Sequence, residues 1–341
     1  MQSLAPAKRD PWYRNHQLRD AIGKAIYDQM AIDPSIYLFG EGAWVKQHYD
    51  APQIWTNFPE RVVTTPIAED GGVNFCVGAS LLGIKPVFDL ITADFSFRAF
   101  DSIANTAAKL NFVRPDELPR TIVIRAEFLT GGPSTGQRPE ALFAHIPGLN
   151  IVIPSTPADA YGLMLTALKT PGVTLFFEDR EISDAIISKQ EDLVLAGPVP
   201  IGCPLWRMKG QRGNVTVVTY GVMRQRVEEL LKKIQMPVGR DYYAPEAALL
   251  VDLIDLRTIY PIDYSYLKFM LGSTGKLLIL ESDITYGGVG AEIVAQISED
   301  LPGTRVKRLG CKRETIPAAS RLHQHLFPSD EEIIHAITDW S

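Results

Sequence analysis

The sequence predicts an α/β protein with two open, mostly parallel sheets, one in each of two domains. Strand-like and helix-like patterns alternate along almost the whole chain of 341 residues. Several of the strand-like runs are short, apolar and bounded by proline, glycine or charge, as buried parallel strands are. One stretch rich in proline and glycine interrupts the alternation near the middle, and the chain is longer than a single small domain requires.

The first half carries the clearest alternation. A helix is expected over 18–30, a strand within 35–42 and a short strand over 62–67, followed by a helix that starts beside Glu69 and buries Cys76. Four more strands are expected at KPVFDLI (85–91), RTIVIRAE (120–127), NIVIP (150–154) and VTLFFED (173–179), with a helical stripe over 100–110. The helix after NIVIP should be capped by Ser155 or Thr156, because proline and an acid follow in its first turn.

The alternation stops at 182–213, which contains LAGPVPIGCPL and is interpreted as a linker. The predicted domains are therefore 15–185 and 214–341, joined by a linker over 186–213. In the second domain the expected strands are NVTVVTYG, AALLVDLID and KLLILES, and the expected helices are 223–234, AEIVAQISEDL and DEEIIHAITDW.

Composition excludes several classes of protein. A net charge of −6 does not favour nucleic acid or an acidic membrane surface as partner. The three cysteines have no spacing typical of zinc, and their odd number argues against a disulfide framework. The first residues lack the apolar run of a signal peptide, and no window approaches the roughly 20 apolar residues of a membrane helix. A soluble, cytoplasmic protein without a metal site of its own is expected.

Polar residues gather where the expected strands end. They occur in FGEG with Glu41, PIAEDGG with Glu69, TADFSF with Asp94 and Phe95, RAEFLTGGPSTGQR and LESDITYGGVG. Because open α/β sheets bind ligands at the carboxyl ends of their strands, these clusters are expected to meet along one edge. Each residue has a plainer explanation as well. Glu69 suits a helix start, Phe95 a core, and Glu41 a solvated turn.

Five stretches in this order resemble a known family. They are FGEG, the run from RVVTTPIAEDGG to NTAAKL, PEALFAHIPGLNIVIPSTPADAYGLM, DLIDLRTIYPID and YGGVGAEIVAQI. Together they are similar to the beta subunit of thiamine-diphosphate-dependent 2-oxoacid dehydrogenases, which in turn resembles the last two domains of transketolase. The resemblance runs over nearly the whole chain. It implies a pyrimidine-binding domain followed by a transketolase C-terminal-like domain.

The resemblance implies roles for individual residues. Glu69 matches the glutamate that hydrogen-bonds the aminopyrimidine ring and helps the cofactor lose its thiazolium C2 proton. Phe95 matches the aromatic residue that stacks on the pyrimidine, and Glu41 matches a glutamate near the cofactor. His145 keeps a family position, where a structural role is the alternative to contact with substrate or acceptor.

Two features of the family are missing. The chain has no GDG motif, so the resemblance implies that magnesium and the diphosphate are held by an alpha-type partner, with thiamine diphosphate shared between subunits of an α2β2 heterotetramer. The loop before PEALFAH lacks the family's histidines and reads GGPSTGQR. Its Gln137 and Arg138 could bind a carboxylate or phosphate of substrate or acceptor instead.

The expected function is therefore that of a beta-type subunit of a two-chain enzyme. That enzyme would decarboxylate a 2-oxoacid and transfer the acyl or two-carbon unit to a lipoyl domain, a carrier-protein thiol or an aldehyde. A split, transketolase-like ketol transferase is the alternative within enzymes, and a non-catalytic supporting subunit is the alternative outside them. Because Glu69 and Phe95 are both present, the sequence favours an active subunit.

Overall fold

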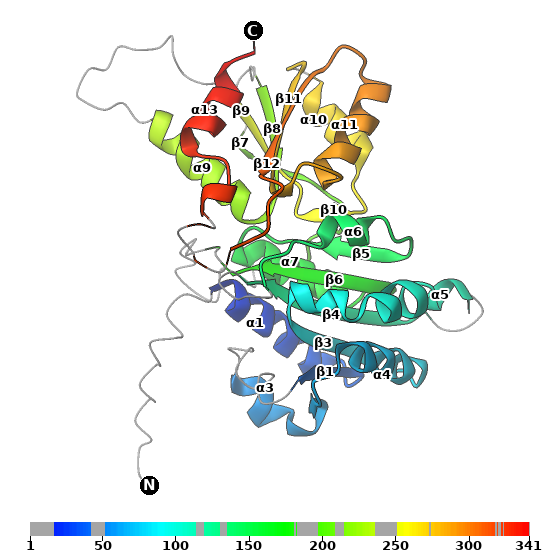
Figure 1. Ribbon diagram of the computed structural model, residues 1–341. Helices are drawn as coiled ribbons and strands as arrows, with labels where there is room; N and C mark the ends of the chain where they lie inside the picture. Colours follow the sequence, from blue (N-terminus) through cyan, green and yellow to red (C-terminus); the bar gives the residue numbers. More distant parts are fainter. Residues whose placement is uncertain are drawn as a thin grey trace.

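The computed structural model describes residues 17–41, 52–113, 119–129, 135–180, 182, 197–208, 215–235, 251–272, 274–317, 319, 322 and 324–340. The structure contains two sheets with helices packed around each, one in the lower and one in the upper half of Figure 1. The predicted fold class, with two mostly parallel sheets, is confirmed. The domain limits 15–185 and 214–341 stay predictions.

The first sheet has seven strands in the order β10-β5-β6-β4-β3-β1-β2. They are β1 (Ile36–Glu41), β2 (Val62–Thr65), β3 (Lys85–Thr92), β4 (Thr121–Phe128), β5 (Leu149–Val152), β6 (Gly172–Asp179) and β10 (Thr258–Tyr260). All neighbours pair in parallel except β10, which runs antiparallel to β5. Because β10 comes from the second half of the chain, it ties the two halves together.

Helices cover both faces of this sheet (Figure 1). They are α1 (Gln17–Ile32), α3 (Pro52–Asn57), α4 (Glu69–Leu81), α5 (Leu110–Val113), α6 (Glu140–Ala144) and α7 (Pro157–Ala167), with short turns η2 (Pro59–Arg61), η3 (Ala93–Phe97) and η4 (Ser102–Ala107). Successive strand residues face opposite sides. Val87 packs in the cluster of α1 and α7, whereas its neighbour Phe88 packs in the cluster of α4.

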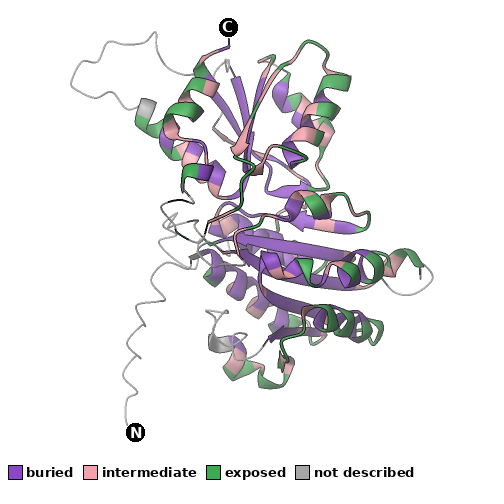
Figure 2. Cartoon of the chain, in the orientation of Figure 1, coloured by how far each residue is buried: buried purple, intermediate pink, exposed green. Residues whose placement is uncertain are grey.

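The second sheet has five strands in the order β12-β11-β8-β9-β7. Its elements are β7 (Leu205–Met208), β8 (Val215–Thr219), α9 (Gly221–Gln235), β9 (Val251–Asp255), α10 (Tyr264–Leu271), β11 (Lys276–Ile284), α11 (Val289–Asp300), β12 (Arg305–Cys311), η5 (Gln324–Leu326) and α13 (Asp330–Thr338). Helices α9 and α13 share one apolar cluster with the sheet, and α10 and α11 share the other. Figure 2 shows the buried strands between helices whose outer sides are exposed.

Two strands differ from the sequence prediction for physical reasons. Leu205–Met208 lies in the expected linker but forms an edge strand antiparallel to β9, because an edge needs pairing on one side only. The sequence does not predict the strand Arg305–Cys311, since its residues are mostly exposed or half-buried and it lacks an apolar run. The stripe over 100–110 contains a π-helical segment, Ser102–Ala107. The Thr156 cap is confirmed, because its hydroxyl accepts the Asp159 N–H.

The two halves of the chain share buried contacts. One apolar cluster runs without a break from Val73 and Phe88 to Ile254 and Ile293. Beside it, Arg257 Nη1 lies 3.1 Å from Asp159 Oδ1 at the start of α7. Arg207 pairs with the same aspartate and, at 2.8 Å, with Asp255. Removing one member of such a buried ionic network leaves a desolvated charge, so the network holds the two halves in one arrangement.

Helix α4 lies unusually close to β3. A Cβ atom on Gly72 would fall 2.1 Å from Cζ of Phe88, whose ring is fully buried. Only glycine allows this approach. The contact fixes the distance of the first turn of α4, and therefore of Glu69, from the sheet. Gly78 lies in the same helix with open space around its Cα.

These two glycines give a matched pair of substitutions. Gly78→Ala is expected to raise the free energy of unfolding by up to about 1 kcal/mol, because alanine has the higher helix propensity. Gly72→Ala is expected to lower it by about 1–3 kcal/mol, because the new methyl group overpacks the buried ring. Urea unfolding of both variants measures the difference. Equal stability of the two variants would contradict the close contact between α4 and β3.

Candidate functional site

A cavity of about 440 Å³ opens at the carboxyl edge of the first sheet. Its walls are formed by Ile67, Glu69, Asp94, Phe95, Phe97 and Arg98. These residues come from the segment after β2 and from the segment after β3, which are neighbours of β1 in the sheet. Glu69 and Phe95 are 26 positions apart in the chain, and parallel pairing brings them into one cavity.

Glu69 is the first residue of α4. The preceding Ala68 offers no side-chain cap, and the acids Glu69 and Asp70 both lie in the first turn. A carboxylate is favoured at this positive end of the helix dipole. Glu69 is half-buried and reaches the cavity, whereas Asp70 is exposed outside it.

A kink in β3 sets the position of Phe95. The β3–β4 register shifts between Asp89 and Thr92, and Ile91 within the shift has φ 69°. Few β-branched residues adopt this left-handed backbone. The Asp89 carboxylate supports it by accepting the Ile91 N–H at 2.8 Å. The chain then turns into η3, which directs the half-buried ring of Phe95 to the cavity.

Asp94 lies in the polar cluster TADFSF, for which the sequence predicts a cofactor role only at Phe95. Its side chain is buried and accepts hydrogen bonds from Thr92 Oγ1, at 3.1 Å, and from the N–H groups of Gly136, at 3.1 Å, and Gln137, at 2.9 Å. A single carboxylate therefore joins the wall of the cavity to the loop before α6. No sequence pattern indicates this, because the loop residues contribute only their backbone.

Glu41 lies at the end of β1 and is 1% exposed. Its Oε1 accepts the Ala68 N–H at 3.0 Å, and its buried Oε2 has no hydrogen-bond partner among the described residues. Burial, together with the nearby carboxylates of Glu69 and Asp89, raises the pKa of Glu41 to about 7, although the Ala68 hydrogen bond acts in the opposite direction. The alternative of a solvated turn acid is wrong, and the structure brings Glu41 next to the start of α4.

The other three candidates lie apart from Glu69. Arg138 pairs through Nε with Glu140 at 2.9 Å and through Nη1 with Asp179 at 2.7 Å, and its guanidinium stacks on Phe128. Gln137 is exposed, and both residues line a second cavity instead. His145 ends α6, is exposed and belongs to neither cavity. Residues 130–134 of the histidine-free loop lie outside the described part of the chain.

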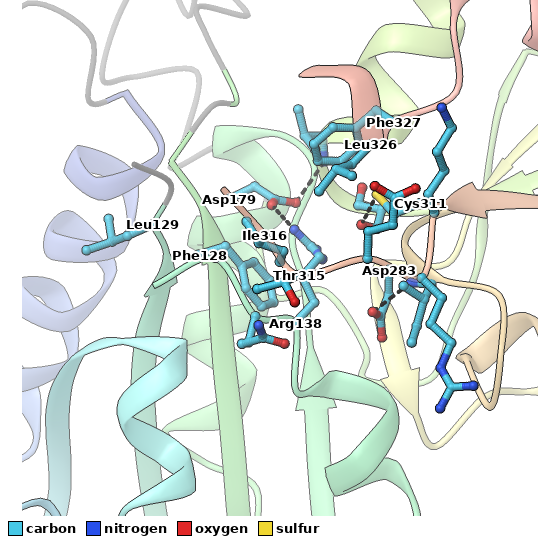
Figure 3. A pocket seen from close by; sticks show the side chains of 18 residues that line it. Phe128, Leu129, Arg138, Asp179, Asp283, Cys311, Thr315, Ile316, Leu326 and Phe327 are labelled. Atoms are coloured by element: carbon cyan, nitrogen blue, oxygen red, sulfur yellow. Dashed lines mark hydrogen bonds and ion pairs between the residues drawn. The ribbon is translucent and has the colours of Figure 1, made fainter. Parts of the chain in front are cut away.

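The second cavity measures about 380 Å³ and lies between the two sheets. Figure 3 shows its wall, in which Phe128, Arg138 and Asp179 of the first half face Asp283, Cys311 and Ile316 of the second. In the described ranges no group of three or more histidine, cysteine or acidic side chains has a geometry that could hold a metal ion. Among those same residues, no helix has the length and apolar character to cross a membrane.

Comparison with known proteins accounts for both halves of the chain. Residues 15–184 match the transketolase pyrimidine binding domain, and residues 206–333 match the transketolase C-terminal domain. A solved split-gene transketolase, described as an inactive beta4 tetramer, aligns over 94% of this chain and 96% of its own, with a TM-score of 0.76 and 21% identity. That likeness concerns the fold.

Relatives with curated names are similar over most of their length. The pyruvate dehydrogenase E1 component subunit beta-1 of Arabidopsis thaliana is 30% identical over 94% of this chain and 87% of its own. The 2-oxoisovalerate dehydrogenase subunit beta of Bacillus subtilis is 28% identical over 94% and 97%. This chain belongs to the family of 2-oxoacid dehydrogenase E1 beta subunits, as the sequence motifs predicted.

The buried Glu41 predicts a pH-dependent stability difference. Its pKa is near 4.5 when unfolded and about 7 when folded, so the folded state keeps a proton that the unfolded state loses, and stability falls as pH rises between these values. Glu41→Gln removes this loss. The free energy of unfolding of the variant, measured with urea and compared with that of wild type, should therefore rise by on the order of 3 kcal/mol from pH 5 to pH 8.

The exposed Glu299 provides the control for this measurement. Glu299→Gln should show no comparable change between the two pH values, because its carboxyl is in water in both states. A stability difference between wild type and Glu41→Gln that stays constant from pH 5 to pH 8 would mean that Glu41 ionises normally in the folded chain.

Proposed function

We propose that this chain is the beta-type subunit of a two-chain enzyme that uses thiamine diphosphate to decarboxylate a 2-oxoacid and passes the acyl unit to a lipoyl or carrier-protein thiol. The single observation that carries the proposal is the shared cavity of Glu69 and Phe95 at the carboxyl edge of the first sheet. When bound, thiamine diphosphate would supply the carbon nucleophile for the reaction.

The cavity suits the pyrimidine half of such a cofactor. Phe95 offers a half-buried ring for stacking on a flat heterocycle, and Ile67 and Phe97 add apolar wall. Glu69 offers a carboxyl group that can share a proton with a ring nitrogen. Family membership supports these assignments, since the relatives are named as subunits of pyruvate and 2-oxoisovalerate dehydrogenases.

Glu41 would position this proton-sharing group. Its carboxyl holds the Ala68 N–H immediately before Glu69, and a second oxygen remains buried beside it. With its pKa near neutrality, Glu41 can be uncharged, which lowers the repulsion between the two acids. In this proposal Glu69 touches the cofactor, and Glu41 acts on the position of Glu69.

The diphosphate and its magnesium ion would be held by an alpha-type partner in an α2β2 assembly. Among the described residues that line the cavity, Arg98 is the one basic side chain, and it is exposed. No group of acidic, histidine or cysteine side chains in the described ranges could coordinate magnesium. Magnesium prefers several oxygen ligands together with phosphate oxygens. The open side of the cavity, with the exposed side chains of Ile67 and Phe97, is the surface proposed to meet the partner.

Replacing Glu69 tests the proton-sharing role. Glu69→Gln in the assembled complex should slow hydrogen–deuterium exchange at the thiazolium C2 by at least about a hundredfold, because an amide cannot share the proton. The exchange is measured by NMR after rapid quenching. Asp70→Asn is the matched control and should exchange within a few-fold of wild type, since Asp70 lies outside the cavity. Wild-type exchange in Glu69→Gln would refute the assignment.

Cofactor binding tests the division of the site between two chains. The chain alone should bind thiamine and thiamine diphosphate with similarly weak affinity in calorimetry, because it contacts only the ring portion. Addition of the alpha-type partner with magnesium should raise the affinity for thiamine diphosphate at least about a hundredfold. The affinity for thiamine should rise far less. Tight, magnesium-dependent binding by the chain alone would place a diphosphate site within this chain and overturn the proposed division.

A further inference from the structure

The cavity between the two sheets lies where an α/β sheet normally binds ligands. In the second sheet, β8 has β9 on one side and β11 on the other, so the chain order reverses beside β8. The crevice at the carboxyl ends of two such strands is the usual ligand position. Val222 follows β8, and Ser282 and Asp283 end β11, and all three line this cavity. Its volume of about 380 Å³ suits a small organic molecule.

Acidic groups outnumber basic ones beneath this cavity. Arg138 is already paired with two buried carboxylates, Glu140 and Asp179. Two further acids, Glu281 and Asp283, lie close enough to interact with Glu140. Four carboxyl groups therefore lie near two guanidinium groups, those of Arg138 and of Arg308, which acts on Glu281, and this excess of acids favours a cationic ligand over an anionic one.

Polar atoms of the wall have unused hydrogen-bonding capacity. Ser282 is 2% exposed, and its hydroxyl has no hydrogen-bond partner within the described ranges. Asp283 accepts the Ile284 N–H through Oδ1 at 2.7 Å, and no described lysine or arginine lies within ion-pair distance of it. A buried hydroxyl without a partner is costly unless a ligand or water satisfies it. Ser282 and Asp283 both line the cavity near the end of β11, where the pairing with β12 is irregular.

Apolar side chains from both halves of the chain form much of the remaining wall. Phe128 and Leu129 come from the first half of the chain, and Ile316, Leu326 and Phe327 from the second (Figure 3). The basic residues Lys312 and Arg313 are exposed, and the guanidinium of Arg313 lies over the exposed ring of Tyr286, 4.2 Å from its centroid. They belong to the rim, so the buried part of the cavity combines an acidic floor with an apolar wall.

We propose that this cavity binds a small organic ammonium ion, whose NH3+ group donates to Asp283 and Ser282 and whose apolar body packs against Phe128, Ile316 and Phe327. A primary ammonium has three donors, which is enough for a carboxylate and a hydroxyl of the same cavity wall. A metal ion fits less well, since the described residues form no metal-binding group. Both a free amine and an α-amino acid present this chemistry, the latter with its carboxylate toward Lys312 at the rim.

Three ligands of one carbon skeleton separate these sources in calorimetry on the full chain. They are 3-methylbutylammonium, L-leucine and 4-methylpentanoate, which carry the ammonium alone, both charges and the carboxylate alone. The first should bind and the last should not. Comparable binding of L-leucine would assign the site to amino acids, and its failure to bind would assign it to amines. No binding of either ammonium compound up to roughly 10 mM, or equal binding of 4-methylpentanoate, would overturn the proposal.

Variants locate the binding. Asp283→Asn should lower the affinity for 3-methylbutylammonium at least about tenfold, and Ser282→Ala should lower it several-fold. Glu314→Gln at the exposed rim should change this affinity less than about twofold. Thermal unfolding followed by circular dichroism verifies that each variant is folded. If Asp283→Asn does not fold, Ser282→Ala alone decides the result. Unchanged binding in the folded wall variants would refute the site. None of these measurements requires the cofactor or a partner, so they stand apart from the function proposed above.

The proton on Asp283 gives an independent signature. The titratable and charged groups that interact with it are Arg138, Glu140, Tyr220, Glu281 and Cys311. Asp179 pairs with Arg138, and Arg308 acts on Glu281. Burial and Glu140 raise the pKa of Asp283 to about 8. The ammonium ion competes with this proton, so its affinity should rise as pH increases from 6 to 8 and then level off. Affinity that falls over this range would contradict the contact with Asp283.

Discussion

The carboxylate of Asp94 is the interaction on which both cavities depend. It lies in the turn that presents Phe95, and it holds the N–H groups of Gly136 and Gln137. The next residue, Arg138, enters the acidic floor between the sheets. The wall of one cavity and the position of the other are therefore set by a single buried side chain. A loop that is held by its backbone in this way can vary in side chains while its course is kept.

Much of the first sheet and of the Glu69 cavity can be predicted from the sequence, because the sheet is built from parallel strands with recognisable apolar runs. The helices and buried strands of the first half follow from short apolar runs and helical spacing, and Thr156 caps its helix as expected. The cluster of Glu69 and Phe95 follows as well, since both lie where strands end. The strand Arg305–Cys311 and the edge strand Leu205–Met208 do not follow, because their sequences lack an apolar run and their pairing is decided by distant residues.

The roles of charged residues were harder to predict than the strands. Glu41 looks like a turn acid in the sequence, yet its burial depends on the segment around Ala68, more than 20 positions away. Arg138 looks like a free cation for a substrate, whereas Glu140 and Asp179 engage it. Such pairings join residues from separate elements, and a single sequence carries no record of them. Only the tertiary structure shows which charges are already satisfied.

The short strand Thr258–Tyr260 has a consequence for the order of assembly. It pairs with Leu149–Val152 at the border of the first sheet, although it is synthesised long after the other strands of that sheet. During synthesis the border strand therefore presents unpaired backbone groups, which other chains can recruit into intermolecular sheets. The first sheet has all its strands only after the second half of the chain has been synthesised. Its last step waits for the second half, so folding of the two halves is coupled through contacts of long sequence separation.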